Sequence, residues 1–234
     1  MRAIILAAGM GTRLRPLTLT TPKALTVVNE KPLLERQIEY LREKGIDEII
    51  VVTGYLKEKF EYLKEKYGVK LIFNDKYDVY NNIYTMYLVK DYLKNSYVLD
   101  ADIYLNRNFF KEKMETSAYF SAYKNFKNEW KLRIGEKDNV EEIQICEKGE
   151  GYILSGVSYW AEKDAKIVVE KLNEIIQGKD FENYYWDDII RLNVDQLNIK
   201  VEKLKEDDIY EIDSIEELEL LNKNLKRGDI KICL

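Results

Sequence analysis

Short apolar runs alternate with amphipathic segments through the first half of the chain. Residues 1–8 and 48–53 are apolar runs that end next to a glycine, which is typical of buried strands. Residues 32–44 carry apolar side chains at helical spacing and are followed by Gly45, so they predict a helix. The same criteria predict a helix over 56–67, strands over 69–73 and 97–99, and a helix over about 84–93. Strands that alternate with helices indicate βαβ units and a largely parallel sheet.

The pattern changes from about Tyr119 onward, where shorter strands are predicted in residues 119–123, 140–145 and 152–160. Three helices follow in the prediction: residues 162–177, a helix that begins near residue 186, and residues 214–225. Ser214 and Glu217 have the spacing of a capping box at the start of the last helix. No internal repeat and no linker rich in Pro, Gly or Ser interrupts the chain. We therefore predict one domain over residues 1–234.

Composition and charge exclude several classes of function. The chain has a net charge of −5, which disfavours a nucleic-acid partner, and it contains no apolar run near the roughly 20 residues of a membrane span. Its two cysteines, Cys146 and Cys233, have no metal-ligand spacing and indicate no disulfide framework, so their role stays open. We expect a cytoplasmic protein without a membrane partner, and the sequence gives no indication of its oligomeric state.

The segment AIILAAGMGTRLRPLTLTTPKAL, residues 3–25, carries the features of an anion site. Two glycines follow the first strand, so backbone N–H groups can approach an anion closely. Arg13 offers a two-pronged guanidinium and Lys23 a compact charge, and residues 1–29 contain no acid. Leu14 replaces the third glycine of a dinucleotide-binding fingerprint, and the spacing of a P-loop is absent. The alternative is a glycine-rich turn with solvated arginines.

This segment resembles the signature of nucleotidyltransferases, which join a nucleoside triphosphate to a phosphorylated small molecule and release pyrophosphate. Further stretches extend the resemblance over nearly the whole chain: YNNIYTMYLVK, YVLDADIYL, NEW, ILSGVSYW, YYWDD and IYEIDS. Together they are similar to the bacterial CTP:phosphocholine cytidylyltransferases. The resemblance implies a Rossmann-like α/β fold, with a mixed, mostly parallel central sheet flanked by helices and a smaller β-rich part. Residues 1–118 would mainly bind the nucleotide, and residues 119–234 mainly the acceptor.

Two aspartates, Asp100 and Asp102, stand at the end of an apolar strand. Residues two apart on a strand point to the same face of the sheet, and Mg²⁺ bound to phosphates needs only one or two protein carboxylates. The resemblance implies that Asp102 and Asp213 hold Mg²⁺, and that Asp100 lies behind them or contacts the nucleotide. Alternatively, Asp213 simply precedes the helix capped by Ser214.

The same resemblance implies a nucleotide site and a set of catalytic groups. The catalytic residues would be Lys23, Arg13 and Asp102. Asn81 and Asn82 would face the base, although capping of a helix N-terminus explains either residue equally well. The implied contacts with CTP are Leu6, Ala7, Ala8, Gly9, Gly11, Thr12, Arg13, Lys23, Gly54, Tyr80, Asn81, Asn82 and Asp100.

The sequence contains no histidine, which excludes mechanisms that need an imidazole. The proposed chemistry needs none. A phosphomonoester has a second pKa of about 6, so it is already an anionic nucleophile at neutral pH.

Two of the three tryptophans stand beside acids, in the pairs Glu129-Trp130 and Trp186-Asp187. A trimethylammonium group has no N–H donor, so proteins hold it with aromatic faces and nearby carboxylates. The resemblance places the choline pocket in these segments, with contacts from Glu129, Trp130, Tyr185, Trp186, Asp187 and Asp188. Trp160, at the end of an apolar strand, is predicted to be a core residue. Phosphoethanolamine, 2-aminoethylphosphonate or a sugar 1-phosphate as the acceptor, and a non-catalytic nucleotide or choline sensor, remain alternatives.

Overall fold

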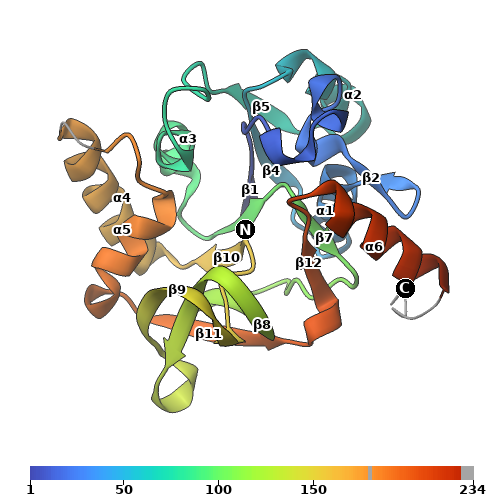
Figure 1. Ribbon diagram of the computed structural model, residues 1–234. Helices are drawn as coiled ribbons and strands as arrows, with labels where there is room; N and C mark the ends of the chain where they lie inside the picture. The colour runs from blue at the N-terminus through green and yellow to red at the C-terminus, as the bar shows by residue number, and fades with distance from the viewer. Residues whose placement is uncertain (179–180, 228–234) are drawn as a thin grey trace.

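The computed structural model describes residues 1–178 and 181–227, so Cys233 lies outside the described residues. A central eight-stranded sheet has the order β11-β8-β10-β6-β1-β4-β5, and β9 pairs with β8 (Figure 1). The strands of this sheet are β1 Arg2–Ala7, β4 Glu48–Thr53, β5 Lys70–Phe73, β6 Ser96–Asp100, β8 Ser117–Ile134, β9 Val140–Tyr152, β10 Val157–Trp160 and β11 Ile199–Leu204. Two small antiparallel pairs join β2 Val27–Val28 to β3 Lys31–Pro32 and β7 Ile103–Leu105 to β12 Ile209–Glu211.

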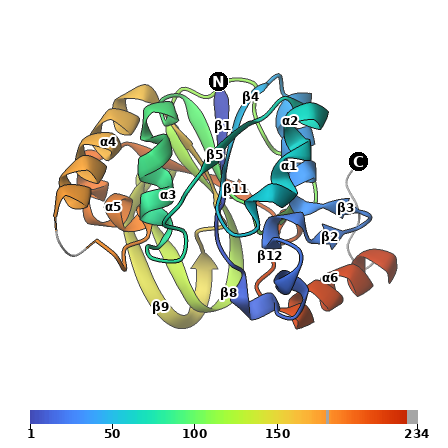
Figure 2. The same ribbon diagram turned by 90° about the horizontal axis from the view of Figure 1, so that it is seen from above.

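Helices cover both faces of the sheet, as the predicted α/β fold requires. The α-helices are α1 Leu33–Glu43, α2 Tyr62–Tyr67, α3 Asn82–Val89, α4 Glu162–Gln177, α5 Trp186–Leu192 and α6 Ile215–Arg227. Figure 2 shows α1 and α2 on one face of the sheet, and α3, α4 and α5 on the other. Short 3₁₀ helices occupy Thr12–Leu14, Leu17–Leu19, Lys23–Leu25, Lys57–Phe60, Lys90–Tyr92, Glu136–Asp138, Val194–Gln196 and Glu206–Asp208. Among the described residues, no helix is long and apolar enough to cross a membrane.

The strands at the centre of the sheet run parallel. β1 pairs in parallel with β4 and β6, β5 in parallel with β4, and β11 in parallel with β8, whereas β10 is antiparallel to both β6 and β8. Alternate residues of β1 enter different cores: Ile5 packs in the core with α1, whereas Ile4 and Leu6 pack in the core with α3 and α4. Burial on both faces explains why β1 is a continuous apolar run. The prediction of a mixed, mostly parallel sheet is confirmed.

The expectation of short strands after residue 119 is wrong for β8 and β9, whereas β10 is short as expected. β8 is 18 residues long, and beyond the central sheet it pairs with β9 as a two-stranded ribbon. The side chains of this ribbon are largely half-buried or exposed, so apolar runs mark only the part of β8 inside the sheet. The run 152–160 is also divided, because Gly156 has a φ of 70°. A Cβ at Gly156 would lie 2.8 Å from Ile103 Cδ1 and 3.0 Å from Asp100 Oδ2, so only glycine fits there.

The predicted helix over 56–67 is also divided, into a 3₁₀ helix and the shorter α2. The capping box of α6 is confirmed. The Glu217 N–H donates to Ser214 Oγ at 3.2 Å, and the Ser214 N–H donates to Glu217 Oε2 at 2.9 Å. These bonds fix the entry of α6 directly after Asp213.

A buried glutamine of α1 holds the turn between β6 and β7. Gln37 is fully buried, and its Nε2 donates to the carbonyl oxygens of Asp100 and Ile103, each at 2.9 Å. Asp102 lies between these two carbonyls in sequence. Gln37 therefore fixes the backbone that carries Asp102, without touching its carboxylate.

We predict that Gln37→Leu lowers the free energy of unfolding by about 2–4 kcal/mol, because an unpaired buried polar group costs about 1–3 kcal/mol. Urea denaturation followed by circular dichroism measures the change. Gln196→Leu is the control, since Gln196 is exposed on the surface, and it should change stability by less than about 0.5 kcal/mol. Equal effects of the two substitutions would contradict the role given to Gln37.

Candidate active site

Two adjoining cavities lie past the ends of β1 and β6. Their volumes are about 410 Å³ and 280 Å³. Ligands in open α/β sheets bind beyond the carboxyl ends of the strands, where these cavities lie. Five residues line both cavities, so the two form one continuous site: Arg13, Asn82, Asp100, Asp102 and Tyr185.

The opening loop wraps one side of the first cavity. Gly11 has a φ of 58°, and a Cβ there would lie 2.8 Å from Lys23 Cβ, so glycine is needed for both conformation and space. Thr18 Oγ1 donates to the Gly11 carbonyl at 2.8 Å and closes the loop on itself. Twelve of the predicted nucleotide contacts line this cavity: Leu6, Ala7, Ala8, Gly9, Gly11, Thr12, Arg13, Lys23, Tyr80, Asn81, Asn82 and Asp100.

Gly54 is the predicted nucleotide contact that does not line the cavity. It lies behind the loop, where a Cβ would meet the Ala8 carbonyl at 2.5 Å and Tyr77 Cβ at 2.6 Å. A glycine is therefore needed at this position because the chain after β4 packs closely against the opening loop. Met10, Tyr77 and Thr85 line the cavity and were missed, although Met10 and Thr85 lie inside the motifs that carry the resemblance.

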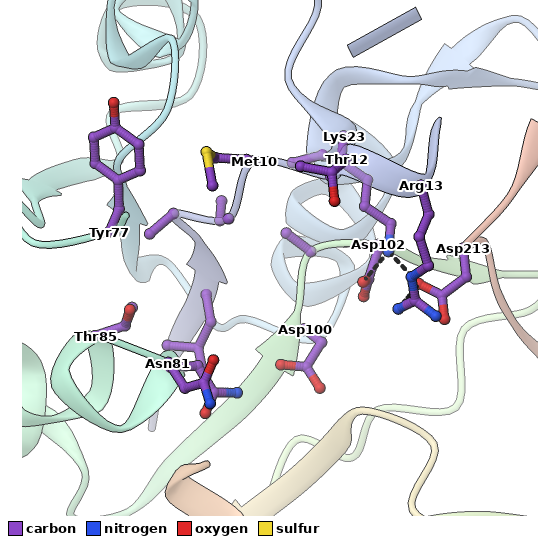
Figure 3. Close-up of a pocket in the computed structure, with 18 of the residues that line it drawn as sticks. Met10, Thr12, Arg13, Lys23, Tyr77, Asn81, Thr85, Asp100, Asp102 and Asp213 are labelled. Atoms are coloured by element: carbon purple, nitrogen blue, oxygen red, sulfur yellow. Dashed lines mark hydrogen bonds and ion pairs between the residues drawn. The ribbon is translucent and has the colours of Figure 1, made fainter. Parts of the chain in front are cut away.

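The centre of the site is an ion cluster contributed by three distant segments (Figure 3). Lys23 Nζ lies 2.6 Å from Asp102 Oδ2 and 2.6 Å from Asp213 Oδ1, and the Arg13 guanidinium lies 2.8 Å from Asp213 Oδ1. Burial of Lys23 opposes its charge, but the two carboxylates outweigh burial and hold its pKa above the usual value. The structure therefore brings together Lys23, Arg13, Asp102 and Asp213, as predicted.

A third carboxylate, Glu211, joins this cluster. One oxygen from each of Asp102, Glu211 and Asp213 lies within 4.8 Å of the others. Although Glu211 is exposed overall, desolvation of its carboxylate, reinforced by repulsion from the other two, raises its pKa well above the usual value. Glu211 was missed, although it stands two residues before Asp213 in the motif IYEIDS. Glu211 is the last residue of β12 and Asp213 lies beyond that strand, so strand alternation does not account for their closeness.

The two aspartates at the end of β6, Asp100 and Asp102, are arranged differently from the prediction. Asp100 is the last residue of β6, but Asp102 lies in the turn that follows, so strand alternation does not explain their common orientation. Both side chains nevertheless line both cavities. Burial, with repulsion from Asp102 and Asp187, raises the pKa of Asp100 well above its usual value.

Aromatic and acidic residues line the second cavity. Five of the six predicted acceptor contacts are there: Glu129, Trp130, Tyr185, Trp186 and Asp187. Trp130 and Tyr185 meet edge to face, with ring centroids 6.2 Å apart. The sixth, Asp188, does not line the cavity. Its carboxylate accepts the Tyr185 N–H at 3.0 Å and pairs with Arg191 at 3.0 Å, so it caps α5.

The two tryptophans of the cavity have different surroundings. Trp186 is 3% exposed, and its ring lies 5.6 Å from that of Trp160. Trp160 is fully buried, so its predicted place in the core is confirmed. Trp186 therefore lines the cavity and also belongs to the hydrophobic core, whereas Trp130 is half-buried at the rim of the cavity.

Tyr119 and Asp187 form a partly buried hydrogen bond at the second cavity. The Tyr119 hydroxyl donates to Asp187 Oδ1 at 2.9 Å. Burial raises the pKa of Asp187 to about 7, while this hydrogen bond acts in the opposite direction. Tyr119 was missed as a site residue because its strand reads as ordinary core.

The two asparagines at the start of α3, Asn81 and Asn82, join it to the segment that leads into α5. Asn81 Nδ2 donates to the Asn183 carbonyl at 2.8 Å, and Asn82 Oδ1 accepts the Trp186 N–H at 2.9 Å. Neither side chain caps α3, so the alternative explanation by helix capping is wrong. Both asparagines line the first cavity, and Asn82 also reaches the second.

Known proteins are similar to this chain over most of its length. A model of the nucleotidyl transferase family matches residues 2–142. The choline-phosphate cytidylyltransferase of Streptococcus pneumoniae is 52% identical over 227 residues, which cover 97% of this chain and 99% of that protein. The 2-aminoethylphosphonate cytidylyltransferase of Lancefieldella rimae is 33% identical over 222 residues, which cover 92% and 89%.

A solved structure of the CTP:phosphocholine cytidylyltransferase from Streptococcus pneumoniae has a TM-score of 0.94 to this protein, at 51% sequence identity. The alignment covers 96% of this chain and 98% of that one. The similarity thus extends over the whole fold, including the segments that carry both cavities. The resemblance drawn from the sequence motifs is confirmed. The chain belongs to the nucleotidyl transferase family.

Proposed function

We propose that this protein joins CTP and phosphocholine to give CDP-choline and pyrophosphate. The observation that carries the proposal is the continuity of the two cavities. A cavity walled by a glycine-rich cationic loop opens into one walled by aromatic rings and carboxylates, and Arg13 and Asp102 line both. An anionic nucleotide and a cationic acceptor can therefore meet beside one charge cluster. Relatives over nearly the full chain are named as cytidylyltransferases.

The first cavity is the proposed nucleotide site. Backbone N–H groups of the loop after β1, together with Lys23 and Arg13, supply the positive charge that a triphosphate needs. Asn81 and Asn82 offer amide groups for the base. Residues 1–118 thus mainly bind the nucleotide and residues 119–234 mainly the acceptor, although Tyr185 and Asp213 also line the first cavity. Both substrates are small and water-soluble, which favours a cytoplasmic location.

The acid cluster is the proposed magnesium site. Hard divalent cations prefer carboxylate oxygens, and Asp102 Oδ1 is buried without a hydrogen-bond partner among the described residues. Asp102 and Asp213 would hold Mg²⁺, with Glu211 as a third carboxylate nearby. When bound, Mg²⁺ offsets the phosphate charge and polarises the phosphoryl group under attack.

The reaction then needs positioning and charge more than acid–base chemistry. A phosphate oxygen of phosphocholine attacks the α-phosphorus of CTP, the bond to the bridging oxygen breaks, and pyrophosphate leaves. The attacking phosphate is largely a dianion at neutral pH, so no side chain has to remove a proton. Lys23 and Arg13 stabilise the negative charge of the transferring group, which is the main task in phosphoryl-type transfer.

The second cavity is the proposed choline site. Trp130, Tyr185 and Trp186 present aromatic surface to a quaternary ammonium. Glu129 and Asp187 supply negative charge nearby. A second candidate acceptor is 2-aminoethylphosphonate, because a relative that is named 2-aminoethylphosphonate cytidylyltransferase matches most of the chain. Its primary ammonium would depend more on the carboxylates and less on the rings.

The proposed function predicts pyrophosphate release with CTP and phosphocholine, with both Mg²⁺ and the Asp102 carboxylate required. Release should be measured for each nucleoside triphosphate against phosphocholine, phosphoethanolamine, 2-aminoethylphosphonate and a sugar 1-phosphate. Asp102→Asn should lower the rate by about 100-fold or more, because a lost metal ligand costs several kcal/mol. A preference of the wild-type protein for another nucleotide or acceptor would contradict the proposal.

Lys23→Met should lower kcat by about 100- to 1,000-fold, because one preorganised charge at the transferring group is worth that much. The Kd for CTP should rise less than about tenfold if Lys23 acts mainly in the transition state. Stopped-flow turnover and equilibrium CTP titration separate the two effects.

A magnesium titration of the same variant provides the control. Removal of Lys23 leaves Asp102 and Asp213 without a cation that lies 2.6 Å away, so the affinity for Mg²⁺ should rise. Rescue of kcat by added Mg²⁺ would show instead that Lys23 only organises the carboxylates.

Trp130→Ala should weaken phosphocholine by about 1–2 kcal/mol, or about 5- to 30-fold in KM, through loss of a cation–π contact. The KM for CTP should stay unchanged. Ile145→Ala is a matched control, since Ile145 pairs with Trp130 across the strands, is 62% exposed and does not line the cavity. Equal losses for both substrates would make Trp130 a structural residue.

A further inference from the structure

A tyrosine behind the second cavity holds the carboxylate of Asp187 in a fixed place. Tyr119 is 3% exposed in β8, and Asp187 lies in the first turn of α5. The hydroxyl donates to Asp187 Oδ1 at 2.9 Å. Burial, followed by the nearby Asp187 carboxylate, raises the pKa of Tyr119 well above its usual value, so the tyrosine remains the donor.

The position of the Tyr119 ring is set by the core. It meets Trp160 edge to face, with centroids 5.9 Å apart and planes at 90°. The Trp160 Nε1–H donates to Ser158 Oγ at 2.9 Å, and Trp160 packs on Trp186. Tyr119 also stands opposite Ser158 of β10 and Val201 of β11 in the sheet. The hydroxyl therefore cannot follow a movement of Asp187 without disturbing this core.

The hydrogen bond uses one oxygen of Asp187, and this matters for the choice of head group. A primary ammonium has three N–H donors and needs several acceptors. A quaternary ammonium has no donor, so it needs only negative charge and apolar contact. A carboxylate with one oxygen already occupied still supplies its charge but offers fewer acceptor positions.

The charges around Asp187 fit a cationic ligand. None of the described lysines or arginines forms an ion pair with it, and Asp188 of its own helix adds negative charge. Asp100 from β6, Glu129 from β8 and Glu211 from β12 line the same cavity, as does Arg13 from the opening loop. Among the described residues Asp187 therefore has no cationic partner in an ion pair, and a cationic ligand would supply one.

We propose that Tyr119 is a positioning residue that occupies one oxygen of Asp187 and so biases the acceptor site toward quaternary over primary ammonium groups. This inference rests on the proposed function, because it concerns the acceptor of that same reaction. Tyr119 acts through Asp187, and its hydroxyl is not assigned a contact with the reacting phosphates.

The sign of the pH effect follows from the linkage between the charge on Asp187 and cation binding. Burial raises the pKa of Asp187 to about 7, so the ionised form that attracts a cation grows as pH rises through that value. The Tyr119 hydrogen bond favours the ionised form. Loss of the hydroxyl should raise this pKa further and move the acidic limb of kcat/KM for phosphocholine to higher pH.

The test is Tyr119→Phe, with kcat/KM measured for phosphocholine and phosphoethanolamine between pH 6 and 9. At pH 7 we expect kcat/KM for phosphocholine to fall about tenfold, mostly through KM, since a hydrogen bond to a charged group is lost. This fall in kcat/KM should become smaller toward pH 9. The kcat/KM for phosphoethanolamine should fall less, so the preference of the enzyme for phosphocholine over phosphoethanolamine should become smaller. The KM for CTP should not change. Tyr123→Phe is the matched control, because Tyr123 lies on the same strand and is 49% exposed.

Asp187→Asn gives a second, independent measurement. In the pH profile of kcat/KM, this variant should lose the acidic limb caused by ionisation of Asp187. It should keep the limb at about pH 6 that is caused by ionisation of the acceptor phosphate. Adding Tyr119→Phe to Asp187→Asn should then leave kcat/KM for both acceptors unchanged, whereas a purely structural tyrosine would lower both values again.

The outcomes separate this inference from the proposed function. If the wild-type protein does not use phosphocholine, the proposed function fails. If it does use phosphocholine, but Tyr119→Phe lowers kcat/KM for both acceptors equally and does not move the acidic limb of the pH profile, the role of Tyr119 is overturned. Melting temperatures of all variants check that folding is retained.

Discussion

The pairing of Lys23 with Asp102 and Asp213 is the interaction on which the organisation of the site depends. The lysine is separated from the two aspartates by 79 and 190 residues in sequence. The carboxylates of Asp102, Glu211 and Asp213 lie close together. Carboxylates this close repel one another strongly when the site is partly buried. A cation between them offsets that repulsion, and the surrounding elements hold their backbones in place. The β7–β12 pair and the capped start of α6 carry Asp213 to the loop, while Gln37 fixes the turn of Asp102.

The same cluster explains how an acidic protein can bind a triphosphate. Lys23 and Arg13 are engaged by carboxylates in this structure, so the phosphates and the carboxylates compete for the same cations. A divalent ion at the carboxylates would release that competition, because it binds both kinds of oxygen. Nucleotide affinity and metal affinity should therefore be linked through Lys23, and neither can be assigned to one residue alone.

The sequence predicted the features that follow from local pattern. β1 and β4 were found because burial on both faces makes them apolar runs, and the opening loop because glycines and cations stand close together in it. Tyr119 and Glu211 could not be found in this way. Their roles arise from the placement of β8 between β10 and β11 and from the pairing of β12 with β7, contacts between segments far apart in the chain. The length of the β8–β9 ribbon was not predicted for a different reason. Both faces of the ribbon are partly solvated, so its residues do not form an apolar run.

The acceptor cavity combines two kinds of wall, and this limits how its specificity can change. Trp186 belongs to a layer with Trp160 and Tyr119 that is also the core between the sheet and α4 and α5. Truncating any of the three to alanine would open a cavity in that core, at a cost of several kcal/mol for a large aromatic residue. Trp130 and Tyr185 stand at the rim, half-buried and exposed respectively, and their rings meet edge to face. Variation at the rim can thus alter the fit of a head group at little cost in stability, whereas the charge and hydrogen bonding of Asp187 are tied to the folding of the domain itself.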